Sequence, residues 1–529
     1  GTMRISTQQY FDTSSSKYQD NYSGVVKAQD QASSGVRVQT ASDDPVAAAQ
    51  LLLLQQQKDM LGQYNGNITS LQNSLTNEES VLASINTTLQ SAQGLALQAG
   101  NLHLSDDDRK AIASQIGALE DQVLGLLNTK DSSGNYMFSG TKTDTPPYSR
   151  NNDGTYTYQG DETPLSLQVS SNLTVSAGDT GKTLLESSSN TGRTQATLLP
   201  PAVNDGKVAI SAGLITSGTA YTKSFSDGQP YKLTFSSSTQ YSVSDKDGND
   251  VTAEITGNGT FDSTKEGASS VNLRGVKFDI SLNLGPDVAS GAPADALVTG
   301  KAFTLESKPD TFSSSRTASN PSTAQLTGGR VTDQPTYAST FPNSGAVIKF
   351  TSGNAYDVYA QPYTPNSKSI ASGTMATGAT SITAAGVTFD VSGTPGAGDQ
   401  FSIGATSNKN MNALDTLGQL RKALLVPADG NQVAKNNLKD VLNTTIGNLT
   451  NASAQIDQVR GSIGARQNAL DIQGQENTSL GLANTSTMSS LANVDMGQAA
   501  IDLTLQQTML QASQLAFVKI SQLSLFSRM

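Results

Sequence analysis

The stretch that decides the fold is ITSLQNSLTNEESVLASINTTLQSAQGLALQA, residues 68–99. Its apolar residues recur at alternating steps of three and four, the a/d heptad spacing of a coiled-coil seam. The seam positions are Ile68, Leu71, Leu75, Leu82, Ile85, Leu89, Ala92, Ala96 and Ala99, with Glu78 as the one polar member. At about 1.5 Å per residue the stretch predicts a helical rod roughly 50 Å long. A rod with so narrow an apolar face needs another helix to cover it.

Capping residues mark where the neighbouring helices begin. Asp44 suits an N-cap, and Pro45 suits the first helical position because its missing N–H would be unpaired there anyway. Ser105 and the acidic run 106–108 predict the start of a further helix, since carboxylates favour the positive end of the helix dipole. That helix is expected to end near Asn128.

The C-terminal part of the chain repeats the helical pattern. One apolar stripe is formed by Leu438, Val441, Leu442, Ile446, Leu449, Ile456, Val459, Ile463 and Leu470. A last helix is expected from about Asp495 to Leu525. Its first apolar side carries Ile501, Leu505, Ala512 and Leu515, and its second carries Leu503, Leu510, Phe517 and Leu525. Because two apolar sides are more than one partner covers, this helix is expected to contact more than one neighbour.

The middle of the chain changes to the period-two alternation of β-strands, from Gly154 to about residue 404. It also contains a possible internal repeat of four strand-like units. Residues 233–235, 241–243, 275–281 and 300–305 resemble, in the same order, residues 348–350, 356–358, 386–392 and 398–403. Preserved order over four units favours two similar β-domains.

These patterns predict an α+β multidomain fold, with a long antiparallel helical coiled-coil rod from both chain ends and two repeated small β-domains inserted in the middle. We expect residues 3–45 and 490–529 to form a terminal coiled-coil layer that is disordered in the monomer. Residues 46–199 and 406–489 would form the rod domain with a β-hairpin. The first β-domain would span 200–310, and the second, its internal repeat, 320–405.

The composition excludes several classes of protein. The 529 residues contain no cysteine, which excludes disulfides, thiolate metal sites and a cysteine nucleophile. A net charge of −11 argues against a nucleic-acid surface, because that requires clustered Lys and Arg. No long apolar run predicts a transmembrane helix. The first residues lack the apolar core of a signal peptide, so we expect export, if any, by a route without a cleaved signal.

Candidate catalytic chemistry is sparse. The single histidine, His103, has no second histidine or cysteine with which to share a metal. The run 245–250 could suggest a calcium loop, but it lacks the glutamate at the twelfth loop position. We favour a hairpin turn there, because Asp-Gly is typical of such turns. We therefore predict no enzyme activity, no catalytic residues, no cofactor and no metal.

Two end motifs carry a resemblance to a known family. The first is SSGVRV at 33–38 followed by SDD at 42–44, and the second joins VR at 459–460 and IGAR at 463–466 with ISQLSLF at 520–526. Together they resemble the N- and C-terminal signatures of the flagellin family. Residues such as 43–48 (DDPVAA) and 104–113 (LSDDDRKAIA) favour its hook-associated branch, whose members join hook to filament.

The resemblance implies a structural adaptor of the bacterial flagellum that assembles with copies of itself and lies outside the cell after type III export. Hook-associated protein 1, flagellin and an export chaperone at the C-terminal helix are the implied partners, with no nucleic acid and no membrane insertion. Candidate assembly residues are Ser34, Gly35, Arg37, Asp43, Asp44, Arg460, Ile463, Gly464, Arg466, Ile501, Leu505, Leu515, Phe517, Leu523, Leu525 and Phe526.

Three alternatives stay open at this point. The chain could be a flagellin that forms the bulk filament, or a secreted adhesin that acts through its β-domains. The arginines at 37, 460 and 466 are either solvated charges or partners of carboxylates such as Asp43 and Asp44 across subunit contacts.

Overall fold

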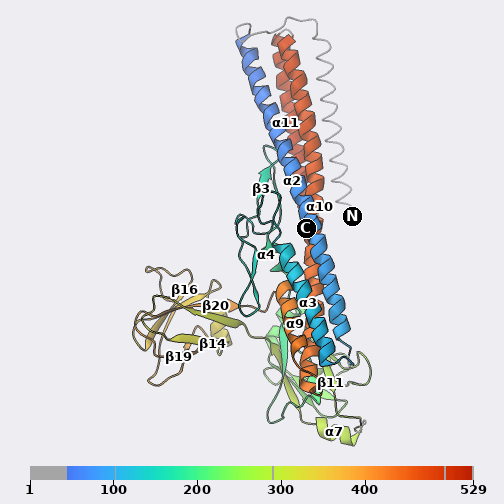
Figure 1. The fold of residues 1–529 in the computed structure, drawn as a ribbon, viewed down its shortest axis with the longest axis vertical. Helices are drawn as coiled ribbons and strands as arrows, with labels where there is room; N and C mark the ends of the chain where they lie inside the picture. The colour runs from blue at the N-terminus through green and yellow to red at the C-terminus, as the bar shows by residue number, and fades with distance from the viewer. Residues whose placement is uncertain (1–43, 102, 287, 289–290, 494–495, 527–529) are drawn as a thin grey trace. The chain divides into compact units, whose positions relative to one another are not determined.

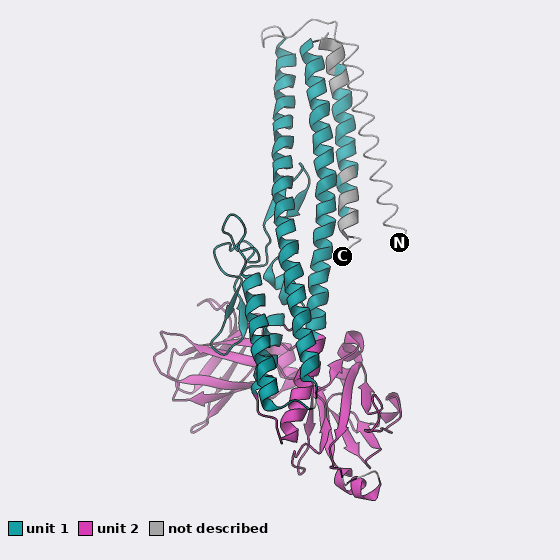
Figure 2. Cartoon of the chain, turned by 45° about the vertical axis from the view of Figure 1, so that its right-hand side comes forward, with its two compact units in different colours: residues 1–188, 412–425, 448–529 teal, residues 189–411, 426–447 magenta. Residues whose placement is uncertain are grey.

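The computed structural model describes residues 44–101, 103–286, 288, 291–493 and 496–526. The fold is α+β, with long helices from the N- and C-terminal parts of the chain and antiparallel sheets from the residues between these parts in the sequence (Figure 1). The chain divides into two compact units, coloured in Figure 2. Unit 1 takes its described residues from 1–188, 412–425 and 448–529, and unit 2 from 189–411 and 426–447.

Long helices form the bulk of unit 1. They are α2 (Pro45–Ala99), α3 (Asp106–Leu127), α9 (Ala413–Leu425), α10 (Gln432–Asn493) and α11 (Met496–Phe526). The first 16 residues of α10 belong to unit 2, since the division falls between residues 447 and 448. Helix α2 is a single 55-residue helix, so the predicted seam is part of a longer rod.

The predicted seam faces the interior of unit 1. Leu71, Leu75, Leu82 and Leu89 are fully buried, as are Ala92 and Ala96. Ile68, Ile85 and Ala99 are at most 4% exposed. The heptad reading of residues 68–99 therefore identified the buried face of α2 correctly.

Helix α10 covers this seam in the antiparallel direction, as expected. Polar side chains bridge the two helices beside the seam at steps of seven or fourteen residues on each helix. These bridges join Asn65 to Thr478, Gln72 to Asp471, Asn86 to Asp457 and Gln93 to Thr450, at 2.7 to 3.2 Å. A heptad repeat on both helices keeps the same face in register along the rod.

Both predicted N-caps are present. The Asp44 carboxylate accepts hydrogen bonds from the backbone N–H groups of Val46 and Ala47, at 3.1 and 3.2 Å. Ser105 and Asp108 form a reciprocal capping box, with each side chain accepting from the other residue's backbone N–H. These bonds satisfy N–H groups that have no partner within the helix.

Two short β-hairpins and one short helix complete unit 1. The first hairpin pairs β1 (Tyr148–Arg150) with β2 (Tyr156–Tyr158), and the second pairs β3 (Ser166–Gln168) with β4 (Thr174–Ser176). Helix α4 (Gly181–Leu185) follows the second hairpin.

Unit 2 contains two β-modules. The strands of the first module are β5 (Thr194–Leu198), β6 (Val208–Ile210), β7 (Leu214–Ile215), β8 (Tyr231–Phe235), β9 (Tyr241–Ser244), β10 (Ser270–Leu273), β11 (Val276–Leu282) and β12 (Ala302–Ser307). Its short helical segments are α5 (Gly218–Ala220), η1 (Tyr221–Phe225), α6 (Ser226–Gly228), η2 (Thr252–Glu254) and α7 (Ala292–Val298). One sheet has the order β5-β12-β8-β9, and the other has β10-β11-β6 with β7 also on β11.

The strands of the second module are β13 (Thr311–Arg316), β14 (Gln325–Val331), β15 (Ala346–Phe350), β16 (Ala355–Ala360), β17 (Ala371–Thr374), β18 (Ser381–Ala384), β19 (Val387–Ser392) and β20 (Gln400–Thr406). Helix α8 (Gln334–Thr340) precedes β15. The sheet orders are β13-β20-β15-β16-β17 and β14-β19-β18. Apart from the extra edge strand β17, the long sheet repeats the order β5-β12-β8-β9 of the first module.

The same turn closes the corresponding hairpin in each module. Arg274-Gly275 joins β10 to β11, and Ala385-Gly386 joins β18 to β19, with positive φ at both residues of each pair. Such two-residue turns match the twist of an antiparallel pair. A Cβ on Gly275 would lie 2.6 Å from the Ser217 carbonyl oxygen, and one on Gly386 would lie 2.5 Å from the Tyr337 nitrogen. Each glycine therefore lets its turn pack closely against a helical segment, at α5 in the first module and at α8 in the second.

The run 245–250 forms the predicted turn. The Asp245 carboxylate accepts hydrogen bonds from the backbone N–H groups of Asp247 and Asn249, both at 2.9 Å. The four-part division proposed from the sequence stays a prediction, and its segment before Asp44 lies outside the described residues.

Candidate assembly surface

Helix α11 exposes apolar side chains along one side. Ile501, Leu505 and Leu515 are 64%, 56% and 62% exposed, and Met509 is 38% exposed. We call these four residues the α11 apolar face. Burying a side chain of this size stabilises a protein by about 1.5–3 kcal/mol. A face that leaves four of them in solvent is therefore suited to contact with another chain.

The inward side of α11 packs within unit 1. Leu510 is buried in a small cluster with Leu61 of α2 and with Leu480 and Ala483 of α10. Helices α2, α10 and α11 thus meet at this cluster, and the ribbon shows them side by side (Figure 1). The α11 apolar face is the side of the helix that this cluster leaves uncovered.

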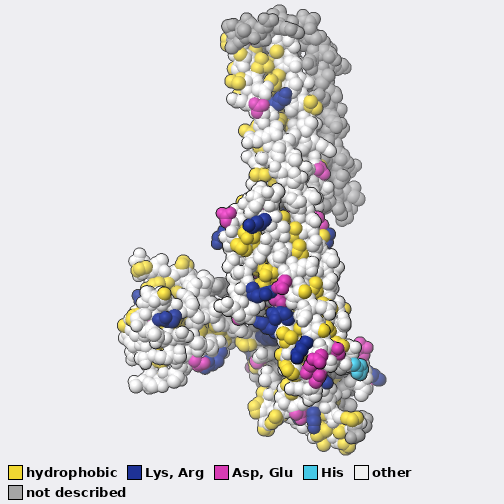
Figure 3. Space-filling model, in the orientation of Figure 1, with side chains coloured by type: hydrophobic (Ala, Val, Ile, Leu, Met, Phe, Trp, Pro, Cys, Tyr) yellow, Lys and Arg dark blue, Asp and Glu magenta, His cyan; other side chains and the backbone are white. Residues whose placement is uncertain are grey.

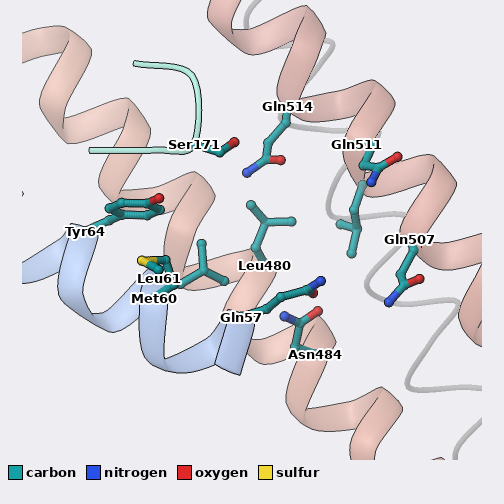
Figure 4. Close-up of a pocket in the computed structure, with 11 residues that line it drawn as sticks. Gln57, Met60, Leu61, Tyr64, Ser171, Leu480, Asn484, Gln507, Gln511 and Gln514 are labelled. Carbon is teal, nitrogen blue, oxygen red and sulfur yellow. The ribbon is translucent and has the colours of Figure 1, made fainter. Parts of the chain in front are cut away.

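A pocket of about 290 Å³ opens beside this cluster. Its lining combines the apolar side chains of Met60, Leu61, Leu480 and Leu510 with the uncharged polar side chains of Gln57, Tyr64, Ser171, Asn484, Gln507, Gln511 and Gln514. Figure 4 shows the glutamines of α11 across from the residues that α2 and α10 supply. A lining without charge suits contact with neutral polar or apolar groups rather than with an ionic ligand.

Charged residues are rare on helices α2 and α11. The only ones in α2 are Lys58, Asp59, Glu78 and Glu79, and those in α11 are Asp502 and Lys519. In the space-filling view, uncharged atoms cover most of the surface of the long helices (Figure 3). Leu52, Leu53 and Met60 of α2 add exposed apolar area. Contact of another chain with this candidate surface would therefore be driven by apolar contact rather than by charge pairing.

The structure describes only some of the candidate residues at the chain ends. Ser34, Gly35, Arg37 and Asp43 lie outside the described residues. Asp44 caps α2, and its predicted part in a subunit contact stays a prediction. Phe517, Leu523, Leu525 and Phe526 belong to α11, but their side chains are outside the described part.

The candidates on α10 lie mostly inside unit 1. Ile463 is 1% exposed, in the apolar interior. Gly464 leaves open space, since an added Cβ would meet no atom within 4 Å. Arg460 pairs with Glu79 of α2 at 2.9 Å and with Asp457 at 3.3 Å, so this arginine has carboxylate partners within its own chain.

Arg466 is the centre of a buried polar contact. Its guanidinium pairs with the Asp179 carboxylate at 2.6 Å and donates to the backbone carbonyls of Ser176 and Gly178, at 3.3 and 3.4 Å. Because its side chain is only 8% exposed, it is not a solvated charge. These bonds connect α10 to residues 178 and 179, which follow β4.

The structure also reveals a buried ion-pair cluster that the sequence reasoning missed. Glu120 of α3 is fully buried and accepts from the Tyr156 hydroxyl at 2.6 Å and from Arg421 Nε of α9 at 2.9 Å. Burial also raises the pKa of the nearby Asp415 carboxyl to about 6. No local pattern marks these residues, because the glutamate and its arginine are 301 positions apart.

Two further properties bear on chemistry and location. Among the described residues, no three histidine or acidic side chains come together as metal ligands would. Within the same ranges, every helix is too short or too polar to cross a membrane.

Part of this chain is similar to a known protein family. The bacterial flagellin N-terminal helical region matches residues 5–143, which include α2 and α3. This chain is therefore similar to flagellins over those residues.

The chain is also similar to the flagellar hook-associated protein 3 of Salmonella typhimurium, with 37% identity over 185 residues. That of Escherichia coli is 37% identical over 192 residues. Each alignment covers 35% of this chain and 57% of the relative. The chain thus spans a little over half the length of these curated relatives.

Solved structures of flagellar proteins are also similar. A flagellar hook-associated protein 3 from Legionella pneumophila has 23% identity and a TM-score of 0.46, covering 84% of this chain and 99% of that one. A flagellar junction protein from the same organism has 21% identity and a TM-score of 0.42, covering 80% and 99%.

Proposed function

We propose that this chain is a structural, non-enzymatic subunit of the bacterial flagellum that joins the hook to the filament. The observation that carries the proposal is its 37% identity to hook-associated protein 3 of two bacteria. The α11 apolar face supports a structural role, because an uncovered apolar helix side favours association with further subunits.

The proposal includes a mode of assembly. Identical subunits would pack side by side in a short layer through heterologous contacts, and flagellin would polymerise on that layer. Residues 3–45 and 490–529 would supply the terminal coiled-coil layer, with the α11 apolar face as its described part. Hook-associated protein 1 would lie on the hook side, and an export chaperone would bind the C-terminal helix before secretion through the type III route. The protein would then reside outside the cell.

Electron microscopy of cells of the source bacterium tests this proposal. Cells without the protein should keep their hooks, lack filaments and shed flagellin into the medium. Cells with normal filaments would overturn the proposal. The rival flagellin role is tested by seeding: purified flagellin should extend long filaments on added seeds, whereas a junction protein should stop after a short layer.

A triple variant tests the α11 apolar face itself. Ile501→Ser, Leu505→Ser and Leu515→Ser together should abolish filaments, because they remove three exposed apolar contacts without opening the core of unit 1. The matched control is Val203→Ser, which changes an 80% exposed apolar residue of unit 2 and should leave filaments normal. Normal filaments with the triple variant would show that assembly uses another surface.

The adhesin role is kept as the alternative for the β-modules. It would gain support if the whole protein bound a surface glycan or host protein, and if a β-module substitution removed that binding while filaments remained normal.

A further inference from the structure

Glu78 is a buried carboxyl group without a suitable donor. It occupies the one polar position of the α2 seam and is 0% exposed. Among the described residues, neither of its carboxylate oxygens meets a hydrogen-bond donor in good geometry. An ionised carboxylate can only accept hydrogen bonds, and leaving such a group buried and unpaired is costly. The site therefore disfavours the ionised form of Glu78.

The groups that face Glu78 come from two other elements. Asp179 belongs to the 177–180 segment, which follows β4, and Arg466 belongs to α10. The chain passes close by, since a Cβ added to Gly178 would lie 3.7 Å from Glu78 Oε2. If all three side chains were ionised, the cluster would carry one net negative charge. A single added proton makes it neutral.

The two carboxyl groups of this cluster differ in their partners. Arg466 already pairs with the Asp179 carboxylate at 2.6 Å, whereas Glu78 has no such bond among the described residues. Burial, followed by the negative charge of Asp179, raises the pKa of Glu78 well above its usual value, while Arg466 and the Asp179 N–H act in the opposite direction. A protonated Glu78 gains what the ionised form lacks, because its O–H can donate to the Asp179 carboxylate.

We propose that Glu78 is a proton-dependent latch between the rod and the 177–180 segment. When protonated, it completes the contact of α2 with Asp179, while Arg466 holds the same segment to α10. When ionised, it faces a second carboxylate in a buried site, and the segment detaches. This inference concerns unit 1 alone and does not depend on the proposed flagellar role.

The sign of the pH dependence follows from this arrangement. A carboxyl with a raised pKa in the folded protein keeps its proton while the unfolded chain loses it. Below the ordinary glutamate pKa both states are protonated, and Glu78 costs no stability. As the pH rises above that value, the folded contact loses stability until Glu78 itself ionises.

Hydrogen exchange of the full-length protein tests the latch. The Ala177 and Gly181 amides report on the segment, since each donates to a backbone carbonyl, of Leu165 and Phe138 respectively. After correction for intrinsic exchange, their protection in the wild type should fall at least tenfold between pH 5 and pH 9. In Glu78→Gln, which imitates the protonated acid, protection should be the same at both pH values.

Glu476→Gln is the matched control. Glu476 is also a buried glutamate but lies on α10. Burial raises its pKa to about 7, and neither Asp179 nor Arg466 acts on it. This variant should keep the wild-type loss of protection at the 177–180 segment. Equal pH dependence in the wild type and Glu78→Gln would overturn the proposal. Failure of Glu78→Gln to fold at pH 5 would also overturn it, because glutamine has the shape and donor of the protonated acid.

Discussion

Unit 1 contains two fully buried glutamates in opposite situations. Glu120 accepts from Tyr156 and from Arg421, whereas Glu78 meets no donor in good geometry among the described residues. Both side chains are 0% exposed, so burial alone does not distinguish them. The difference teaches that a buried charge stabilises the fold only where neighbouring elements supply donors. Without them, the same residue becomes sensitive to pH.

The largest expected effect comes from removing the partner of Glu120. Arg421→Ala leaves a buried carboxylate without its principal cation and should lower the free energy of unfolding of unit 1 by about 3 kcal/mol. Urea unfolding followed by helical circular dichroism measures this change. Lys182→Ala is the control, because it breaks an exposed pair with Glu162 and should cost less than about 1 kcal/mol. Equal losses in the two variants would contradict the distinction drawn between buried and exposed pairs.

The same substitution at the two glutamates should give opposite signs at pH 8. Glu120→Gln weakens the hydrogen bonds with Arg421 and Tyr156 and should cost about 2 kcal/mol of unfolding free energy. Glu78→Gln should instead raise the unfolding free energy at this pH, because it removes the raised-pKa carboxyl. Urea titrations of both variants and of the wild type measure the two changes in unfolding free energy. Two changes of the same sign would contradict the claim that Glu120 and Glu78 affect stability in opposite ways.

The smallest effect is expected beside Glu78. Gly178→Ala places a methyl group 3.7 Å from Glu78 Oε2 and 3.8 Å from the Met137 carbonyl oxygen, which is ordinary contact. It should stabilise unit 1 by about 0.5 kcal/mol, because alanine restricts the unfolded chain more than glycine does. A melting temperature clearly below that of the wild type would show that the segment needs more space than the structure indicates.

Local patterns predicted much of the fold. The seam spacing gave the buried face of α2, and Asp44 and Ser105 gave the starts of two helices. Alternation placed strands in the middle of the chain. Helix α9 was not predicted, and one hairpin was expected where unit 1 has two.

The candidate site was less predictable. The apolar positions Ile501, Leu505 and Leu515 of α11 could be read from the sequence, and all three are exposed. The roles of Arg460 and Arg466 could not be read, because their partners, Glu79 and Asp179, lie hundreds of residues away. Sequence spacing gives the face on which a residue lies, but not the element that approaches it.

The sequence by itself determined most of the long helical segments and their apolar faces, because hydrophobic periodicity and capping act over a few neighbouring residues. The tertiary structure alone decided which charges are satisfied. It brought Arg421 to Glu120 and placed Asp179 and Arg466 around Glu78. The energy of a buried charge depends on the donors within hydrogen-bond distance, and those donors are set by how distant elements pack.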